Sequence, residues 1–295
     1  MNNEQFLLDR KTGIGGSDIS AILGINPWKT ALDVYFDKVA DEIVYEQNDN
    51  MERGRKLEEY VLKEYSDRNS AELEIGLEME RDKQYSCLIA HYDAKIKDRN
   101  VIVEAKSSKM NPFSWGNVIP AYYRTQVAHY AAIADCEYVD VAVLFNQWQY
   151  AQFTYYRDEE YEKYIRKTAV DFWNNHVLKK IPPQPQNLEE VKKVYTKANL
   201  ASSLKANDIM KNAVQELKLL EEDKKNIEHR LNTVKAYIMQ TMEENEILED
   251  EEGKSLIVWR NSTKRLFDTN AFKENHIDLY NKFVKNVESR TFRIT

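Results

Sequence analysis

The chain has 295 residues, of which 42% are hydrophobic and 31% are charged, a composition that indicates a globular protein and excludes wholesale disorder. Its formal net charge is −7, with 23 Lys and Arg against 30 Asp and Glu in residues 1–185 and 19 against 19 in the remainder, so the overall basic excess common in nucleic-acid-binding proteins is absent. Two cysteines, Cys87 and Cys136, are too few for a disulfide framework or a four-cysteine metal cluster.

The N-terminal third of the chain predicts helices followed by strands. The stretch "GGSDISAILGINPWKTALDVYFDKV" begins with a glycine-rich turn and predicts a short helix, a break and a second helix from about Thr30. Residues 50–68 carry apolar side chains at helical spacing. Residues 72–106 change to short strand-like runs, with a turn at 97–100 between the last two.

The middle of the chain continues an alternating pattern. Small and apolar residues predict a helix over 119–135, two apolar runs predict strands over 138–156, and an amphipathic pattern predicts a helix over 157–180. The proline-rich stretch 181–187 is the best domain boundary. We therefore predict a mixed α/β domain over residues 1–185.

Residues 186–295 predict a helical extension with a small α+β tail. Apolar residues recur in steps of three and four from Met210 to Ile238, interrupted by Lys224, which is typical of a coiled-coil-like helix that needs a partner surface. Self-association, docking on another protein and packing back on the chain's own domain all satisfy that need. The final segment predicts a strand, a helix and a second strand.

The segment "HYDAKIKDRNVIVEAKSS" carries candidate catalytic residues. Side chains alternate along a strand, so Glu104 and Lys106 project to the same face, and Asp93 on the preceding run could lie opposite Glu104. Two adjacent carboxylates repel each other unless a cation lies between them, and oxygen ligands suit Mg²⁺ or Mn²⁺. The lysine could orient a water molecule or stabilise charge on a phosphate. Taken alone, the same segment also fits an ordinary charged surface hairpin.

Three further features could belong to the same site. Glu58 lies on the preceding helix, and Gln126 lies in the middle of the following one. Arg10 and Ser17, seven residues apart in "RKTGIGGS", offer a guanidinium, a hydroxyl and glycine-loop amides that suit a phosphate. Singly, each also has an ordinary interpretation: a solvated acid, a hydrogen-bonded core amide and a tight turn before a helix.

The order of helix Glu, strand Asp, strand Glu-x-Lys and helix Gln resembles that of the PD-(D/E)XK nuclease superfamily. Within it, residues 8–183 resemble the YqaJ-type viral recombinase nucleases and, more distantly, lambda exonuclease. The resemblance depends on the stretches "RKTGIGGSDISAILGINPWKT", "RGRKLEEYV", "HYDAKI", "VIVEAKSS", "IPAYYRTQVAHYAAI", "VAVLF" and "RDEEYEKYI". It implies a restriction-endonuclease-like α/β core, a mixed central sheet flanked by helices, before the coiled-coil-like extension.

The resemblance also implies roles for individual residues. Asp93 and Glu104 would bind the metal together with the Ala105 carbonyl, Lys106 would position water, Glu58 would be an auxiliary acid and metal ligand, and Gln126 would be the active-site glutamine. Arg10 and Ser17 would hold the 5′-phosphate of the DNA. Relatives have a small residue and then Asp-Gly where this chain has Tyr92, Asp93 and Ala94, which puts the local geometry around Asp93 in question.

The implied function is that of a phage-type, Mg²⁺- or Mn²⁺-dependent DNA exonuclease. It would degrade linear double-stranded DNA 5′ to 3′ from its ends and leave single strands for recombination. The resemblance implies a ring-shaped homo-oligomer, such as a trimer, that works beside a single-strand annealing recombinase protein (RecT- or Bet-like). An endonuclease of the same superfamily and a non-catalytic oligomeric DNA-binding or adaptor protein are the alternatives.

The same resemblance implies a protein encoded by a phage or prophage and present in the cytoplasm of the bacterial host. No apolar run approaches the roughly 18 residues of a membrane span. The N-terminal segment also lacks the basic-then-apolar layout of a signal peptide. We therefore expect no association with a membrane.

Overall fold

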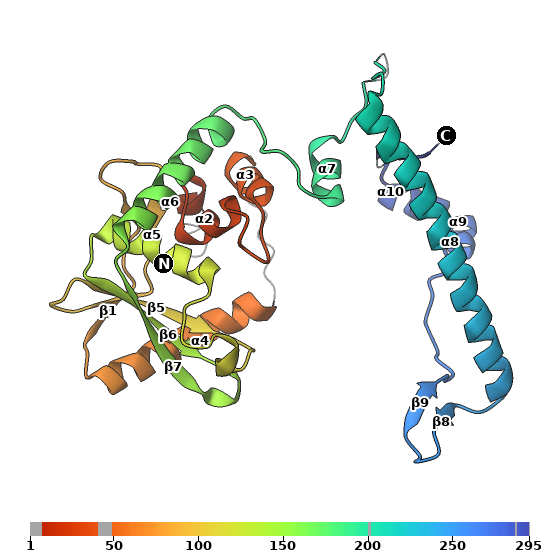
Figure 1. Ribbon diagram of the computed structural model, residues 1–295, viewed down its shortest axis with the longest axis horizontal. Coiled ribbons are helices and arrows are strands. Elements are labelled where there is room, and N and C mark those ends of the chain that lie inside the picture. The colour runs from red at the N-terminus through yellow and green to blue at the C-terminus, as the bar shows by residue number, and fades with distance from the viewer. Residues whose placement is uncertain (1–7, 41–48, 200–201, 287, 295) are drawn as a thin grey trace. The chain divides into compact units, whose positions relative to one another are not determined.

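The computed structural model describes residues 8–40, 49–199, 202–286 and 288–294 (Figure 1). The chain forms two compact units, Met1–Val194 and Tyr195–Thr295. The predicted domain boundary at residue 185 precedes this division, because helix α7 (Leu188–Val194) belongs to the first unit. Lys193 on α7 pairs with Asp33, and Val194 packs against the hydrophobic core. None of the described helices is long and apolar enough to cross a membrane.

A five-stranded mixed sheet forms the centre of the first unit. Its strand order is β1-β4-β5-β6-β7, and only β5 and β6 run parallel. The strands are β1 (Leu73–Ile75), β4 (Ala94–Ile96), β5 (Val101–Ser107), β6 (Tyr138–Leu144) and β7 (Tyr150–Tyr156). Helix α5 (Ala121–Ala134) lies between β5 and β6 in the sequence, as the crossover connection that a parallel pair requires.

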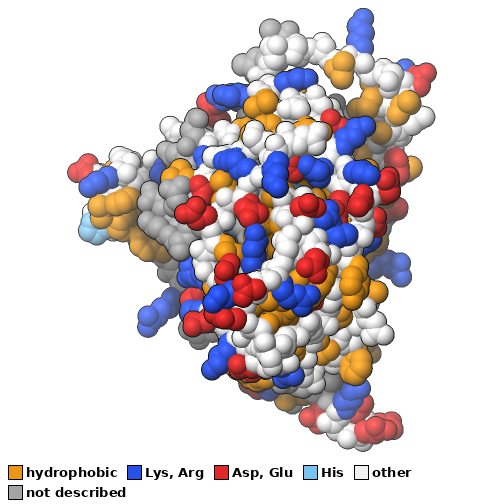
Figure 2. Space-filling model, turned by 90° about the vertical axis from the view of Figure 1, so that its left-hand side faces the viewer, with side chains coloured by type: hydrophobic (Ala, Val, Ile, Leu, Met, Phe, Trp, Pro, Cys, Tyr) orange, Lys and Arg blue, Asp and Glu red, His pale blue; other side chains and the backbone are white. Residues whose placement is uncertain are grey.

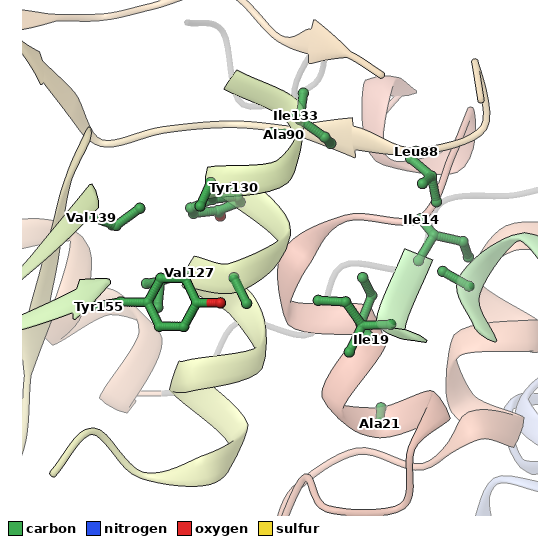
Figure 3. Packing of buried hydrophobic residues seen from close by; sticks show 14 of the residues in the cluster. Ile14, Ile19, Ala21, Leu88, Ala90, Val127, Tyr130, Ile133, Val139 and Tyr155 are labelled. Atoms are coloured by element: carbon green, nitrogen blue, oxygen red, sulfur yellow. The ribbon is translucent and has the colours of Figure 1, made fainter. Parts of the chain in front are cut away.

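Helices cover both faces of this sheet (Figure 1). One face packs against helices α2 (Gly16–Ile22), α3 (Ala31–Val39), α5 and α6 (Glu159–Phe172). Figure 3 shows α5 in the middle of this layer, with Val139 and Tyr155 of the sheet on one side and Ile19 of α2 on the other. The other face packs against α4 (Asp49–Asn69), from which Val61, Leu62 and Tyr65 are buried. The expected mixed sheet flanked by helices is confirmed.

Local sequence explains where the helices of the first unit begin and end. Thr30 caps α3, because its hydroxyl accepts from the Asp33 amide while the Asp33 carboxylate accepts from the Thr30 amide. Pro120 precedes α5, and the helix ends at Asp135 in a left-handed conformation. Asp158 caps α6, which continues into a π-helical turn at Trp173–Val177.

The strand-like run at residues 85–96 is divided in the structure. Its first part forms β3 (Ile89–Ala90), which pairs with β2 (Glu80–Arg81) in a separate two-stranded sheet, whereas its second part is β4 of the central sheet. The backbone of Ile14 bonds to Cys87 and Ile89 and holds the first part away from the central sheet. Residues 91–93 therefore lie outside both ladders, and Asp93 can leave the plane of the sheet.

The second unit is dominated by α8 (Asp208–Met242), one continuous helix of 35 residues that begins at the Asn207 cap. Most of its apolar side chains are exposed within the unit, and among its described residues only Met242 is buried. The hairpin β8 (Ile247–Glu249) and β9 (Ser255–Val258) follows, and then helices α9 (Thr269–Asn275) and α10 (Ile277–Phe283). The expected final strand is not found in residues 284–286 and 288–294, where no pairing partner is present.

Candidate active site

The candidate site lies where β4 and β5 separate. The two strands pair antiparallel at Lys95–Ile102 and Ala94–Val103, and one further step in this register places Asp93 opposite Glu104. The Asp93 carboxylate accepts a hydrogen bond from the Ala105 amide at 2.8 Å. Ala94 is fully buried against α4. Alanine at this position thus permits the acid before it to reach the β5 strand, which answers the question raised by the missing glycine.

Glu104 is the most buried acid of this group, with 2% of its surface exposed. Its Oε1 atom accepts from Lys106 Nζ and, at 2.8 Å, from Gln126 Nε2 on α5. Its Oε2 atom is buried without a hydrogen-bond partner among the described residues. An unpaired buried carboxylate oxygen is costly, so this atom marks the place where a cation or a bound water would be stabilised.

The Tyr123 ring and the Glu104 carboxylate hold Lys106 beside the two acids. Its Nζ atom lies 5.2 Å from the centroid of the Tyr123 ring, which adds a cation–π contact to the Glu104 ion pair. Burial opposes the charged ammonium, but Glu104 and Asp93 outweigh it and raise the Lys106 pKa above its usual value. The lysine is therefore a fixed positive charge and hydrogen-bond donor.

Glu58 faces the same space from α4. It lines a cavity of about 240 Å³ together with Asp93, Ala105, Lys106 and other residues, namely Gly54, Val61 and Ser107. Gly54 precedes Glu58 by one helical turn. A Cβ atom placed on Gly54 would have Ser107 Oγ as its nearest neighbour, at 3.9 Å, so this part of the cavity is open. The structure thus brings Glu58, Asp93, Ala105 and Lys106 to one cavity. Glu104 accepts hydrogen bonds from both Lys106 and Gln126 beside it.

The three carboxyl groups carry more negative charge than one lysine offsets. Burial, followed by the Asp93 charge, raises the pKa of Glu58 to about 7. Burial likewise raises the pKa of Asp93, and burial together with the neighbouring Asp93 raises that of Glu104. Raised carboxyl pKa values are typical of sites that bind a cation or transfer protons.

The donor set fits a hard divalent cation that keeps part of its water shell. No three His, Cys, Asp or Glu side chains in the described ranges converge closely enough to enclose an ion. Asp93, Glu104 and the Ala105 carbonyl nevertheless offer oxygen ligands on one side of the cavity. Mg²⁺ commonly takes one or two carboxylates and retains several waters, so this open arrangement suits it. Glu104 Oε2, to which no described residue donates a hydrogen bond, is the atom that supports the fit.

Arg10 and Ser17 lie together at the start of α2, which packs against α5. Arg10 Nη2 is 3.3 Å from Ser17 Oγ and 3.3 Å from the Asp18 carboxylate. Asp18 is fully buried and also pairs with Lys29 and Lys38. Burial alone would raise its pKa, but the three cations hold it well below the usual value. Lys29 also pairs with Asp37 at 2.7 Å, so three cations face two carboxylates and leave one positive charge in excess on an otherwise acidic domain.

A close glycine contact joins this positive cluster to the candidate catalytic residues. A Cβ atom on Gly16 would lie 2.9 Å from Gln126 Cγ and 2.9 Å from the Tyr130 ring, so only glycine fits there. Gly16 begins the helix that carries Ser17 and Asp18, whereas Gln126 bonds Glu104. The two predicted groups of residues are therefore parts of one packed assembly.

Sequence reasoning missed several residues of this site. Tyr130 accepts from Gln126 at 2.9 Å, Tyr123 lies under Lys106, and Asp18 with Lys38 supports Arg10. The spacing of four between Gln126 and Tyr130 was a usable signal, since such residues share a helix face. The Asp18–Lys38 pair gave none, because its partners are 20 residues apart and meet only through the packing of α2 on α3.

The molecular surface carries both signs of charge. On the face in Figure 2, lysine and arginine side chains alternate with aspartate and glutamate, and hydrophobic patches lie between them. This agrees with a sequence that carries 42 Lys and Arg against 49 Asp and Glu. Attraction of an anionic ligand would therefore come from local groups such as the Arg10 cluster.

Comparison with known proteins supports the sequence prediction. Residues 5–137 match the model of the YqaJ-like viral recombinase domain. The whole chain is similar to the protein YqaJ of Bacillus subtilis (strain 168), with 28% identity over 303 residues that span 100% of this chain and 94% of the relative. The similarity therefore includes the C-terminal unit, and the predicted resemblance to YqaJ-type proteins is confirmed.

Solved structures share the fold. An alkaline exonuclease (LHK-Exo) from Laribacter hongkongensis matches with a TM-score of 0.52 and 15% identity over 61% of this chain and 94% of its own. A complex of LHK-Exo with dAMP matches with a TM-score of 0.51 and 14% identity over 65% and 97%. The restriction-endonuclease-like core predicted from the sequence is thereby confirmed as a fold.

Proposed function

We propose that this chain, which resembles the YqaJ-like viral recombinase domain over residues 5–137, is a divalent-metal-dependent deoxyribonuclease that degrades linear duplex DNA from its ends. The observation that carries the proposal is the buried Glu104 carboxylate. One oxygen is bound by Lys106 and Gln126, and the other lies near the Asp93 carboxyl and receives no N–H or hydroxyl donor from the described residues. A charged surface hairpin would not bury its acid in this way.

Each residue has a role that follows from its position. Asp93, Glu104 and the Ala105 carbonyl would hold Mg²⁺ or Mn²⁺, with Glu58 as an auxiliary acid reaching the same cavity from α4. The cation, when bound, would lower the pKa of a water and offset charge on the scissile phosphate. Lys106 orients the attacking water and stabilises negative charge on the phosphate oxygens. Gln126 and Tyr123 fix Glu104 and Lys106 in place.

Arg10 and Ser17 would hold a terminal 5′-phosphate. Their side chains lie within hydrogen-bond distance of each other, and a guanidinium paired with a hydroxyl suits phosphate oxygens. The contact of Gly16 with Gln126 fixes this group against the catalytic residues. Such an arrangement would present a DNA end to the cavity in one direction, which supports the 5′-to-3′ polarity.

The resemblance supports a proposal for the assembly and the partners. A ring-shaped homo-oligomer, such as a trimer, would encircle DNA, and a single-strand annealing recombinase protein (RecT- or Bet-like) would receive the single strands. The exposed apolar side chains of α8 support an additional contact surface in the extension. A bacterial cytoplasm and a phage or prophage origin complete the proposal.

The decisive experiment uses end-labelled linear duplex, with and without a 5′-phosphate, in Mg²⁺, Mn²⁺ or EDTA. The unmodified protein should degrade the 5′-phosphorylated duplex in Mg²⁺ or Mn²⁺ but not in EDTA. Glu104→Ala should reduce the rate by at least about 100-fold, the loss expected when a transition-state charge contact is removed. Glu160→Ala is the matched control, since Glu160 is an exposed acid on α6. Absence of degradation in both metals would refute the enzyme proposal.

The same assay separates the two alternatives. An endonuclease would cut closed circular DNA and would be insensitive to Arg10→Gln, whereas an end-dependent exonuclease would lose its preference for 5′-phosphorylated ends. A non-catalytic adaptor would show no metal-dependent degradation and would retain its function in Asp93→Ala and Glu104→Ala.

A further inference from the structure

A second, larger cavity lies beside the candidate active site. Its volume is about 480 Å³, within the range of small-ligand sites. It is lined by Asp49, Glu52, Arg53, Lys56, Leu57, Leu144, Phe145 and Trp148. None of these residues was assigned a role by the sequence or by the mechanism above.

The two cavities share their walls. Arg53, Lys56 and Leu57 face the larger cavity, whereas Gly54 and Glu58 face the catalytic one, and these residues alternate along the same turns of α4. On the sheet side, Ser107 of β5 lines the catalytic cavity and pairs in register with Leu144 of β6, which lines the larger one. The two cavities are therefore adjacent along α4 and along the β5–β6 pair.

Trp148 has the properties of a binding residue rather than a core residue. It lies in the short helical turn Asn146–Trp148 between β6 and β7, and 67% of its surface is exposed. Its backbone φ is +61°, a conformation that is unfavourable for a bulky side chain. The Tyr60 ring packs against it in a T-shaped arrangement at a centroid distance of 5.5 Å and fixes the orientation of the indole. A strained backbone that presents a large apolar ring to solvent indicates a function at the ring face.

Arg53 supplies a positive charge next to this ring. Its side chain is half-buried, and no ion pair is formed with it by the residues that the structure describes. Lys56 in the same cavity is instead paired with Glu52. A guanidinium beside an exposed indole matches the phosphate and the flat apolar base of a nucleotide.

We propose that this cavity binds a nucleotide of the DNA strand adjacent to the scissile phosphate, with the base stacked on Trp148 and its phosphate bound by Arg53. This inference rests on the proposed function, because it takes DNA as the ligand of the neighbouring site. Stacking on an aromatic face tolerates any base, so the subsite would hold the strand without selecting sequence. It would also keep an unpaired base out of the duplex while the next bond is cut.

The test is equilibrium binding without catalysis. Fluorescein-labelled duplex with a 5′-phosphate is titrated in EDTA with the unmodified protein, Trp148→Ala, Trp148→Phe and Tyr164→Ala, and binding is followed by anisotropy. Trp148→Ala should weaken binding roughly 5- to 100-fold, as expected for one lost base–aromatic stack. Trp148→Phe should retain most of the affinity. Tyr164→Ala removes an exposed aromatic ring on α6 and should bind as the unmodified protein does.

Abasic nucleotides locate the contact. An abasic site is placed in turn at each of the first few nucleotides of either strand. At the position that contacts Trp148, the abasic site should weaken binding of the unmodified protein by the same factor as Trp148→Ala does. The same abasic site should not weaken binding of Trp148→Ala any further. Arg53→Gln should reduce the slope of log K against log salt by about one, since it removes one phosphate contact. Equal affinity of the unmodified protein and Trp148→Ala for every probe would overturn the proposal.

Trp148→Asn gives an independent readout. Asparagine tolerates a positive φ, so this variant should melt a few degrees higher than the unmodified protein while it binds DNA as weakly as Trp148→Ala. Loss of both folding and binding in Trp148→Asn would show that the ring is structural and would overturn the proposal. The binding test needs no hydrolysis, so an inactive protein with Trp148-dependent binding would refute only the nuclease function.

Discussion

His129 gives a test of how the core of the candidate site depends on pH. It lies on α5 one turn after Gln126, it is fully buried, and its Nε2 atom is 2.8 Å from the Ile89 carbonyl oxygen. Burial lowers the His129 pKa to about 4; the Ile89 bond and the charges of Asp82 and Asp18 favour the protonated ring, and Arg166 opposes it. The folded protein therefore holds this imidazole neutral at pH values where the unfolded chain would protonate it.

The magnitude follows from the two pKa values. An ordinary histidine in the unfolded chain titrates near 6.5, so the unfolded state gains a proton first as the pH falls. The stabilising contribution is complete above pH 6.5 and is lost progressively down to about pH 4. Linkage gives a loss of about 2 kcal/mol between pH 7.5 and pH 5 from this residue alone. The ring has no exposed surface, so solvent does not screen this contribution.

Urea unfolding of the unmodified protein and His129→Gln, at pH 7.5 and at pH 5, measures this contribution. Tryptophan fluorescence reports mainly on the first unit, where Trp115 is buried in the core. The fall in unfolding free energy from pH 7.5 to pH 5 should be about 2 kcal/mol smaller in His129→Gln than in the unmodified protein. His176→Gln, which changes a partly exposed histidine, should show the same fall as the unmodified protein. An equal drop in His129→Gln and the unmodified protein would refute the reasoning.

Two further substitutions test the packing that connects the proposed phosphate-binding residues, Arg10 and Ser17, to the candidate catalytic residues. Gly16→Ala should lower nuclease activity by roughly 10- to 100-fold, because its Cβ would displace Gln126; Gly15→Ala, whose Cβ would have 3.8 Å of space, should be near neutral in the same rate assay. Asp18→Asn should lower the free energy of unfolding by about 3 kcal/mol, because Lys38 stays buried without its partner charge; a loss below about 1 kcal/mol in urea would contradict the assigned network.

Much of the first unit could be predicted because its patterns are local. Helical periodicity gave α4, α5 and α6, and the alternation of Val101, Glu104 and their neighbours gave the two faces of β5. The separation of β3 from β4 could not be predicted in the same way. It depends on the backbone of Ile14, more than 70 residues earlier, which captures Cys87 and Ile89.

In the candidate site, too, residues placed by local structure could be predicted and residues placed by tertiary packing could not. The expected position of Asp93 opposite Glu104 follows from a short turn, so register could be counted from the sequence. The Asp18 cluster, Tyr123 under Lys106 and the Trp148 cavity depend on tertiary packing between elements far apart in the chain. An exposed tryptophan in a loop carries no periodic signal, and its positive φ is visible only in the structure.

The separation of β4 from β5 links the fold to the chemistry. A fully paired β4 would bond the Ala105 amide to its own backbone and would direct the residue before Ala94 along the sheet. Because the strands part after Ala94 and Val103, the Asp93 carboxylate takes the Ala105 amide instead and stays beside Glu104. Two acids are thus held close together by backbone geometry, and their mutual repulsion lowers the stability of the folded protein unless a proton or a cation offsets it. If the proposed metal binds between them, its removal by a chelator should lower the free energy of unfolding as well as the nuclease activity.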